Sequence, residues 1–274
     1  MKKLNLCVAI LVIVAFSCKN EKPAEFTRLG DGTPYSNSPE MMNGKVKSVT
    51  EKNYWAIPDG DTFKKGNPLT EADRDSLGGW TEDFEAVFDV NGVIQSCTAM
   101  DGTGTQLWKN ESIVENGLIV KRSIFITDTL SSYDKYEYGE NKFITGGARY
   151  RAKLDTLMFS VNVKTNEIGY PVDAQFFNSK GDSTWKNTYN YDAQNNFVSF
   201  ENFDKTGKRT FAYDVKYNEK NKVSELTLKD KDDKITDVNY ITYDYDDKGN
   251  WIKGVVKNLK DKVVIEERTY TYFD

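Results

Sequence analysis

Carboxylates are the side chains in this chain best suited to acid–base chemistry, because the sequence contains no histidine. That absence removes Ser-His-Asp and Cys-His catalysis and the common zinc sites. Paired acids could still cleave a glycosidic bond, which needs two carboxylates. The candidates are Asp232-Asp233, Asp244-Asp246-Asp247 and Glu266-Glu267. All lie in expected turns or on an expected strand, so turn formation explains them better than catalysis, and we assign no catalytic residue.

Asp244 and Asp246 are also candidate ligands of a weak calcium site. Gly249 follows them within one turn, and oxygen atoms are the ligands that Ca²⁺ prefers. The spacing lacks the full calcium-loop pattern and its distal bidentate glutamate, and turn formation accounts for the same residues. The sequence predicts no cofactor and no other metal site.

Aromatic side chains are the stronger signal for binding. The chain has 5 Trp, 16 Tyr and 15 Phe, which supply flat surfaces for stacking on sugars or packing against a protein. Most are expected to pack the protein itself. Trp55 and Trp80 flank an irregular segment instead, and we predict that these two contact a ligand.

Three Asp-Ser/Thr-Leu triplets are similar to the short O-glycosylation acceptor pattern of secreted proteins from Bacteroidetes-type bacteria. The acceptor residues would be Ser76, Thr129 and Thr156. A three-residue motif is weak in a chain this rich in Asp and Thr.

The N-terminal segment reads as a secretory signal. Lys2 and Lys3 precede an apolar run that is too short to span a bilayer, and Cys18 follows it. Residues 15–18 resemble a bacterial lipobox, which predicts a signal peptide over 1–17 and acylation of Cys18. Residues 18–43 are predicted to be a flexible tether. The protein would then be lipid-anchored in the cell envelope, on the outer membrane, with a membrane as one partner.

Charge and cysteine use exclude other classes. The formal charge is −5 and no basic cluster occurs, so nucleic acid is not an expected partner. Cys7 lies inside the signal, which leaves Cys97 alone without an internal disulfide. Cys97 lies next to Val93 and Ile94 and is predicted to be a buried, inert thiol.

Residues 44–274 are predicted to form one β domain. Alternating polarity begins near Lys45, and an irregular insertion is expected over 56–80, where Thr70 and Asp73 could cap a short helix. Later in the chain an aromatic residue, an Asp or Asn, a polar turn and a strand recur at about 26-residue spacing. The fold expected is all-β: an antiparallel meander of about seven two-stranded repeats in an open curved sheet.

The phrases at residues 189–197 and 243–251 resemble the YDxxGN core of the Rhs/YD-repeat family, and especially its short lipoproteins from Bacteroidetes-type bacteria. The similarity is good over about residues 185–274 and faint before them. This resemblance implies a β-meander. The core motif and toxin domain of large Rhs proteins have no counterpart here.

These observations favour a non-catalytic envelope lipoprotein, a β-repeat scaffold that binds a protein partner or a glycan. One alternative is a carboxylate-dependent polysaccharide hydrolase, which glycosidase turnover would reveal. Another is a purely structural envelope component. We expect no enzyme activity.

Overall fold

The computed structural model describes residues 26–29, 40–70, 72–73, 77 and 82–274. Within them the chain is almost entirely β-structure. The elements in chain order are β1 (Phe26–Leu29), β2 (Glu40–Asn43), β3 (Val46–Asp59), β4 (Thr62–Pro68), β5 (Asp83–Phe88), β6 (Ile94–Met100), β7 (Gln106–Glu115), β8 (Leu118–Ile126), β9 (Thr129–Tyr138), β10 (Ile144–Arg151), the 3₁₀ turn η1 (Ala152–Leu154), β11 (Thr156–Thr165), β12 (Pro171–Asn178), β13 (Ser183–Tyr191), β14 (Phe197–Asp204), β15 (Arg209–Tyr217), β16 (Val223–Asp230), β17 (Ile235–Tyr245), β18 (Trp251–Asn258) and β19 (Val263–Tyr272).

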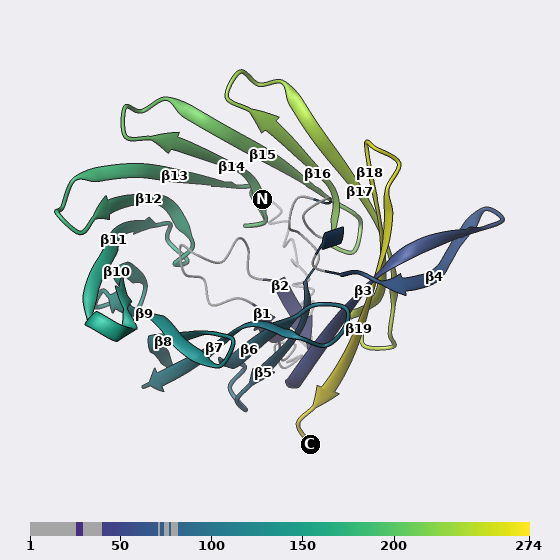
Figure 1. The fold of residues 1–274 in the computed structure, drawn as a ribbon, viewed down its shortest axis with the longest axis horizontal. Helices are drawn as coiled ribbons and strands as arrows, with labels where there is room; N and C mark the ends of the chain where they lie inside the picture. The colour runs from purple at the N-terminus through teal and green to yellow at the C-terminus, as the bar shows by residue number, and fades with distance from the viewer. Residues whose placement is uncertain (1–25, 30–39, 71, 74–76, 78–81) are drawn as a thin grey trace, which may run out of the picture.

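The sheet closes into a barrel, so the expectation of an open curved sheet is wrong. Each strand from β5 to β19 pairs antiparallel with the next, and β19 then pairs with β3 from Val264↔Trp55 to Tyr272↔Val46. The wall is therefore β3 and β5 to β19, sixteen strands, and Figure 1 shows them as a ring. Closure pairs the backbone groups that two free edges would leave exposed.

Eleven hairpin turns share one hydrogen-bond pattern. The N–H of the first turn residue donates to the carbonyl four residues on, and its own carbonyl accepts from the third residue after it. That third residue has positive φ, as at Gly249 and Asn195. In the turn after β17, Asp246 Oδ1 also accepts the N–H groups of Lys248 and Asn250, at 3.0 and 2.8 Å. Asp, Asn and Gly therefore recur because this turn requires them.

Tyrosines at or near the ends of five strands bond to the neighbouring strand. Their hydroxyl groups donate to backbone carbonyls about 20 residues earlier, at the start of the strand immediately before. The five bonds are Tyr138 to Ile119 (2.8 Å), Tyr191 to Pro171 (2.9 Å), Tyr217 to Phe197 (2.7 Å), Tyr243 to Val223 (2.9 Å) and Tyr270 to Trp251 (2.9 Å). The repeated aromatic residue thus holds the barrel end together.

Apolar side chains point into the ring. Figure 1 places β2 inside it, and Glu40 of β2 bonds to Arg268 of β19, which identifies the inner face of the wall. The cross-strand pairs can be followed around the barrel from Arg268. They place the main core cluster on this same inner face. Within that cluster Phe176 stacks on Trp185 at 4.6 Å between ring centroids, and Phe200 stacks on Tyr213 at 4.9 Å.

Charged pairs cover the outer face. Lys216 of β15 lies opposite Glu225 of β16 and its Nζ is 2.8 Å from the Glu225 carboxylate. Lys186 pairs with Asp173 at 2.6 Å on the same outer face. A transmembrane β-barrel carries an apolar band on its outer face and polar groups inside. The pairs Lys216–Glu225 and Lys186–Asp173 instead place charge on the outer face of this wall.

The segment predicted to be an irregular insertion, 56–80, begins as a regular hairpin. β3 continues to Asp59 and pairs with β4, which lies beside the outer half of β3 and extends away from the ring (Figure 1). After β4, Thr70 and Asp73 make the predicted capping contacts, with Thr70 N donating to Asp73 Oδ2 at 2.9 Å.

No helix among the described residues is both long and apolar enough to cross a membrane.

The predicted tether also contains ordered structure. Residues 40–43, assigned to it from composition, form β2 and pair with β1. Composition alone missed this strand because its stability comes from contacts with the barrel interior rather than from its own sequence. The signal peptide boundary and Cys18 lie outside the described residues.

Candidate functional site

Strand β19 contributes to both parts of the candidate site, which are an ionic cluster around Arg268 and a small cavity beside Glu266. In β19 the residues at alternate positions face the barrel interior: Val264, Glu266, Arg268, Tyr270 and Tyr272. Cross-strand pairing sets Arg268 beside Glu51 of β3, and sets Glu266 beside Asn53 of β3 and Gly254 of β18. Two charged side chains, Glu266 and Arg268, thus lie on a face of β19 that is otherwise aromatic and apolar.

Arg268 is the centre of a buried ionic cluster. Its Nε donates to Glu51 Oε2 at 2.8 Å, and its Nη1 donates to Glu40 Oε2 at 2.7 Å. The guanidinium also lies over the ring of Trp251, 3.8 Å from its centroid. Arg268 is only 9% exposed. A buried charge needs such partners, because leaving it unpaired costs several kcal/mol.

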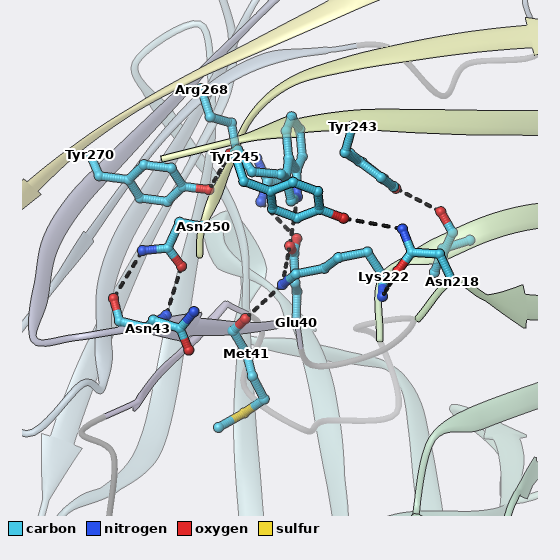
Figure 2. Close-up of polar contacts among 12 residues, drawn as sticks. Glu40, Met41, Asn43, Asn218, Lys222, Tyr243, Tyr245, Asn250, Arg268 and Tyr270 are labelled. Carbon is cyan, nitrogen blue, oxygen red and sulfur yellow. Dashed lines mark hydrogen bonds and ion pairs between the residues drawn. The ribbon is translucent and has the colours of Figure 1, made fainter. Parts of the chain in front are cut away.

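Glu40 brings the N-terminal segment into this cluster. Its Oε1 accepts from Trp251 Nε1 at 2.7 Å and lies 3.3 Å from Lys222 Nζ, while its Oε2 takes the bond from Arg268. Figure 2 shows the Glu40 carboxylate between the side chains of Arg268 and Lys222. Three donors from three segments of the wall therefore converge on one carboxylate.

Backbone contacts hold β2 in the same position. Asn250 Oδ1 accepts the N–H of Asn43 at 2.7 Å, and Asn250 Nδ2 donates to the Asn43 carbonyl at 2.9 Å (Figure 2). Lys222 Nζ donates to the carbonyl of Met41 at 3.0 Å. Asn250 is almost fully buried, so this amide pair binds β2 as a neighbouring strand would.

Burial and neighbouring charges push the carboxyl groups of the cluster in different directions. Burial raises the pKa of Glu40, but Arg268 and Lys222 outweigh it and hold that pKa below its usual value. Burial raises the pKa of Glu51 despite Arg268. Burial and the charge of Glu51 raise the pKa of Glu266 to about 8. With a pKa of about 8, the Glu266 carboxyl keeps its proton at neutral pH.

A small cavity adjoins Glu266. Its volume is about 100 Å³, and the lining residues are Leu77, Leu226, Asn239, Ile241, Val256, Asn258, Lys262, Val264 and Glu266. Gly254 leaves room for the carboxyl group, since a Cβ there would lie 3.2 Å from Glu266 Oε2. An apolar cavity of about 150 Å³ is known to hold benzene. The cavity here is smaller and has polar residues in its lining, so it suits a small, partly apolar group that can hydrogen-bond to the Glu266 carboxyl.

Trp55, one of the two predicted ligand contacts, lies beside the cavity. It is the cross-strand partner of Val264, and its indole donates to Asp73. Trp80, the second predicted contact, and Ser76, one of the predicted glycosylation acceptors, lie outside the described residues. Thr129 and Thr156 are exposed at the starts of β9 and β11, each after an Asp with positive φ, and their glycosylation stays a prediction.

The predicted acidic groups do not come together. Glu266 and Glu267 are neighbours on one strand and point to opposite faces, with Glu267 bonded to Lys65 outside. Asp244 also faces outward, opposite Lys253, whereas Asp246 belongs to the turn. Among the described residues, no group of three potential His, Cys, Asp or Glu ligands is close enough to hold a metal ion. The weak calcium site stays a prediction.

Cys97 faces the interior beside Ala86 and packs against the smaller core cluster. Burial raises the pKa of its thiol to about 12. A thiol with so high a pKa is protonated and unreactive at neutral pH.

Sequence reasoning missed the central residues of the site. Glu40 fell in the predicted tether, and Trp251 and Lys222 fell at turn positions. One signal was present: Arg268 and Glu266 share their alternating face with Val264, Tyr270 and Tyr272. Charges on the aromatic face of a strand indicate buried partners.

Comparison with known proteins supports the fold alone. The chain is similar to the structure of a porin-like protein from Bacteroides uniformis, with a TM-score of 0.53, 10% identity and coverage of 82% of this chain and 96% of that one. A porin-like protein from Bacteroides vulgatus gives a TM-score of 0.38, with 10% identity and coverage of 83% and 99%. A TcdB2-TccC3 structure gives 0.31, with 9% identity and coverage of 82% and 14%. The last two scores are too low to support an argument.

No protein-family model matches this chain, and no curated protein matches it in sequence. The resemblance to the Rhs/YD-repeat family therefore has no support from sequence comparison. What the chain shares with a solved structure is a β-barrel fold.

Proposed function

We propose that this protein is a non-catalytic binding barrel of the cell envelope, which holds a small, mainly apolar molecule in its lumen. The observation that carries this proposal is the cavity on the inner face of β16 to β19. Leu226, Ile241 and Val256 give it apolar sides, and its polar groups come from Glu266, Asn239, Asn258 and Lys262. Binding sites for small molecules combine these two features.

The predicted envelope protein or glycan partner stays a proposal. Trp55 lies beside the cavity wall rather than on an outer surface, which favours a ligand inside the barrel. A hydrolase receives less support, because a glycosidase needs two carboxylates on either side of one bond. Glu266 is the acid that lines the cavity, and Glu51 is already bonded to Arg268.

The porin-like description of the structural neighbour is not carried over to this chain. Outward ion pairs such as Lys216–Glu225 place charge where a membrane-spanning barrel meets lipid. We propose instead that the barrel is held near a membrane by an acyl anchor on Cys18.

The anchor is tested by Cys18→Ala. A two-chain acyl anchor gives stable membrane attachment, so the variant is expected in the aqueous fraction after cell lysis. Immunoblotting of membrane and aqueous fractions would measure this. Retention of the variant in the membrane fraction to the wild-type extent would contradict the anchor.

The cavity is tested by filling it. Val256 lines the cavity and Val255, its neighbour in β18, faces outward, so the two residues give a matched pair. Ligand-detected NMR with indole, a small ring with one N–H donor, would measure binding. We expect Val256→Phe to weaken indole binding at least about tenfold, which is about 1.4 kcal/mol, and Val255→Phe to leave it unchanged. Equal effects of the two variants, or no binding by the wild type, would contradict the proposal.

A further inference from the structure

The cluster around Glu40 has the form of a binding site that is already occupied. We propose that Arg268, Lys222 and Trp251 form a carboxylate-binding subsite of the lumen, that Glu40 is its internal ligand, and that an organic monocarboxylate can take the place of Glu40. This subsite is distinct from the apolar cavity and does not depend on a ligand there.

The donors surround one carboxylate. Arg268 Nη1 and Trp251 Nε1 reach the two oxygens of Glu40 at 2.7 Å each, and Lys222 Nζ lies 3.3 Å from Oε1. Arg268 and Trp251 are themselves more than nine-tenths buried. Charge-assisted bonds of this length in a buried setting are strong, and an arginine recognises the geometry of a carboxylate.

The donors and the acceptor belong to different parts of the fold. Arg268 lies on β19, Trp251 at the start of β18 and Lys222 in the turn before β16. The closed wall therefore positions all three donors. Glu40 lies on the four-residue strand β2, which joins the wall through Gly44. Gly44 has φ +85°, a conformation that glycine adopts without strain and that suits a change of direction between two elements.

Charge balance favours occupancy by an anion. With Glu40 removed, Arg268 and Lys222 carry two positive charges and Glu51 supplies one negative charge. Glu266 does not complete the balance near neutral pH, because burial and the charge of Glu51 raise its pKa to about 8. A carboxylate in the place of Glu40 would restore neutrality, whereas a neutral ligand would not.

An exogenous ligand must compete with a tethered one. A short flexible tether gives an effective concentration on the order of millimolar, so a weak acid does not displace Glu40 from the wild-type protein at low concentration. Removing the Glu40 side chain takes this competitor away. The vacated site then becomes testable with a small probe.

The test is rescue of Glu40→Ala by acetate. Thermal melting would be recorded in sodium acetate and in sodium chloride at equal ionic strength and pH 7. We expect acetate to raise the melting temperature of Glu40→Ala by about 2–4 °C relative to chloride, and to have no such effect on the wild type. Glu40→Gln is the matched control, since its amide fills the same space and should block rescue.

Rescue should also require the donors. In the Glu40→Ala background, Lys222→Met should reduce the acetate effect, whereas Lys216→Met on the outer face should not. Equal melting of Glu40→Ala in the two salts would overturn the proposal. Failure of Glu40→Ala to fold in either salt, with Glu40→Gln folded, would also overturn it. Indole binding by Glu40→Ala reports on the cavity separately, so failure of the two proposals can be distinguished.

Discussion

Replacing Arg268 with methionine is expected to lower the free energy of unfolding by about 3–5 kcal/mol. Methionine keeps much of the side-chain volume and removes the charge. Glu40 and Glu51 would then lose a shared cation in the barrel interior, where both now bond to it at 2.7 and 2.8 Å. Urea denaturation followed by tryptophan fluorescence would measure the loss.

Arg209→Met is the matched control. Arg209 also bridges two acids, Glu201 at 3.2 Å and Asp233 at 2.6 Å, but on the water-facing side. Ion pairs in such positions contribute about 0–1 kcal/mol. Adding Glu40→Gln and Glu51→Gln to Arg268→Met should recover part of the lost stability. Similar losses for Arg268→Met and Arg209→Met would contradict the buried cluster.

Glu266→Gln is expected to stabilise the protein at high pH and to leave it nearly unchanged at about pH 4, below the unfolded pKa. The pKa of Glu266 is raised from 4.5 to about 8 by burial and by Glu51, so the folded state binds this proton more tightly than the unfolded state. The stability that this gives is complete below the unfolded pKa and is lost as pH rises through about 8. At pH 9 we expect the variant to gain about 1–3 kcal/mol, a range reduced for access of water to the cavity.

The pH profile of the wild type follows from two opposing groups. Glu40 has a lowered pKa, so its contribution is present above 4.5 and is lost as pH falls through its folded value. Stability should therefore be greatest near pH 4.5 and should fall as pH rises from there to about 8. Glu267→Gln, which changes an exposed neighbour, should not alter the loss of stability between about pH 4.5 and 8. A Glu266→Gln profile that parallels the wild type would show that Glu266 does not cause this loss.

The turns could be predicted from sequence because their chemistry is local. Asp192, Asn218 and Asp246 were expected to open turns, and in the structure each accepts backbone N–H groups two and four residues on. Asn195, Asn221 and Gly249 then adopt positive φ. A few neighbouring residues determine such turns, so spacing and residue type were sufficient.

Closure could not be predicted in the same way. It depends on the pairing of β19 with β3, whose residues are more than 200 positions apart, as in the contact between Arg268 and Glu51. No local pattern distinguishes an edge strand that stays open from one that pairs with a distant edge. Strand twist and the bulges beside the turns bring the two edges together.

The candidate site was missed for a related reason. Composition places Glu40 in a tether, although its carboxylate has three partners, of which Arg268 and Trp251 are buried. Trp251 ends the repeated phrase at residues 243–251, and nothing local indicates that its indole donates to Glu40. Alternation did place Glu266 and Arg268 on the aromatic face of β19, but which distant acid or base each would meet required the closed barrel.

Methyl NMR of the barrel titrated with indole would test the central claim most directly. The claim is that the inner face of β16 to β19 holds a small apolar ligand. It predicts shifts for the methyl groups of Leu226, Ile241, Val256 and Val264, and none for the outward-facing Val255. Shifts confined to outer methyl groups, or no shifts at saturating indole, would contradict the account.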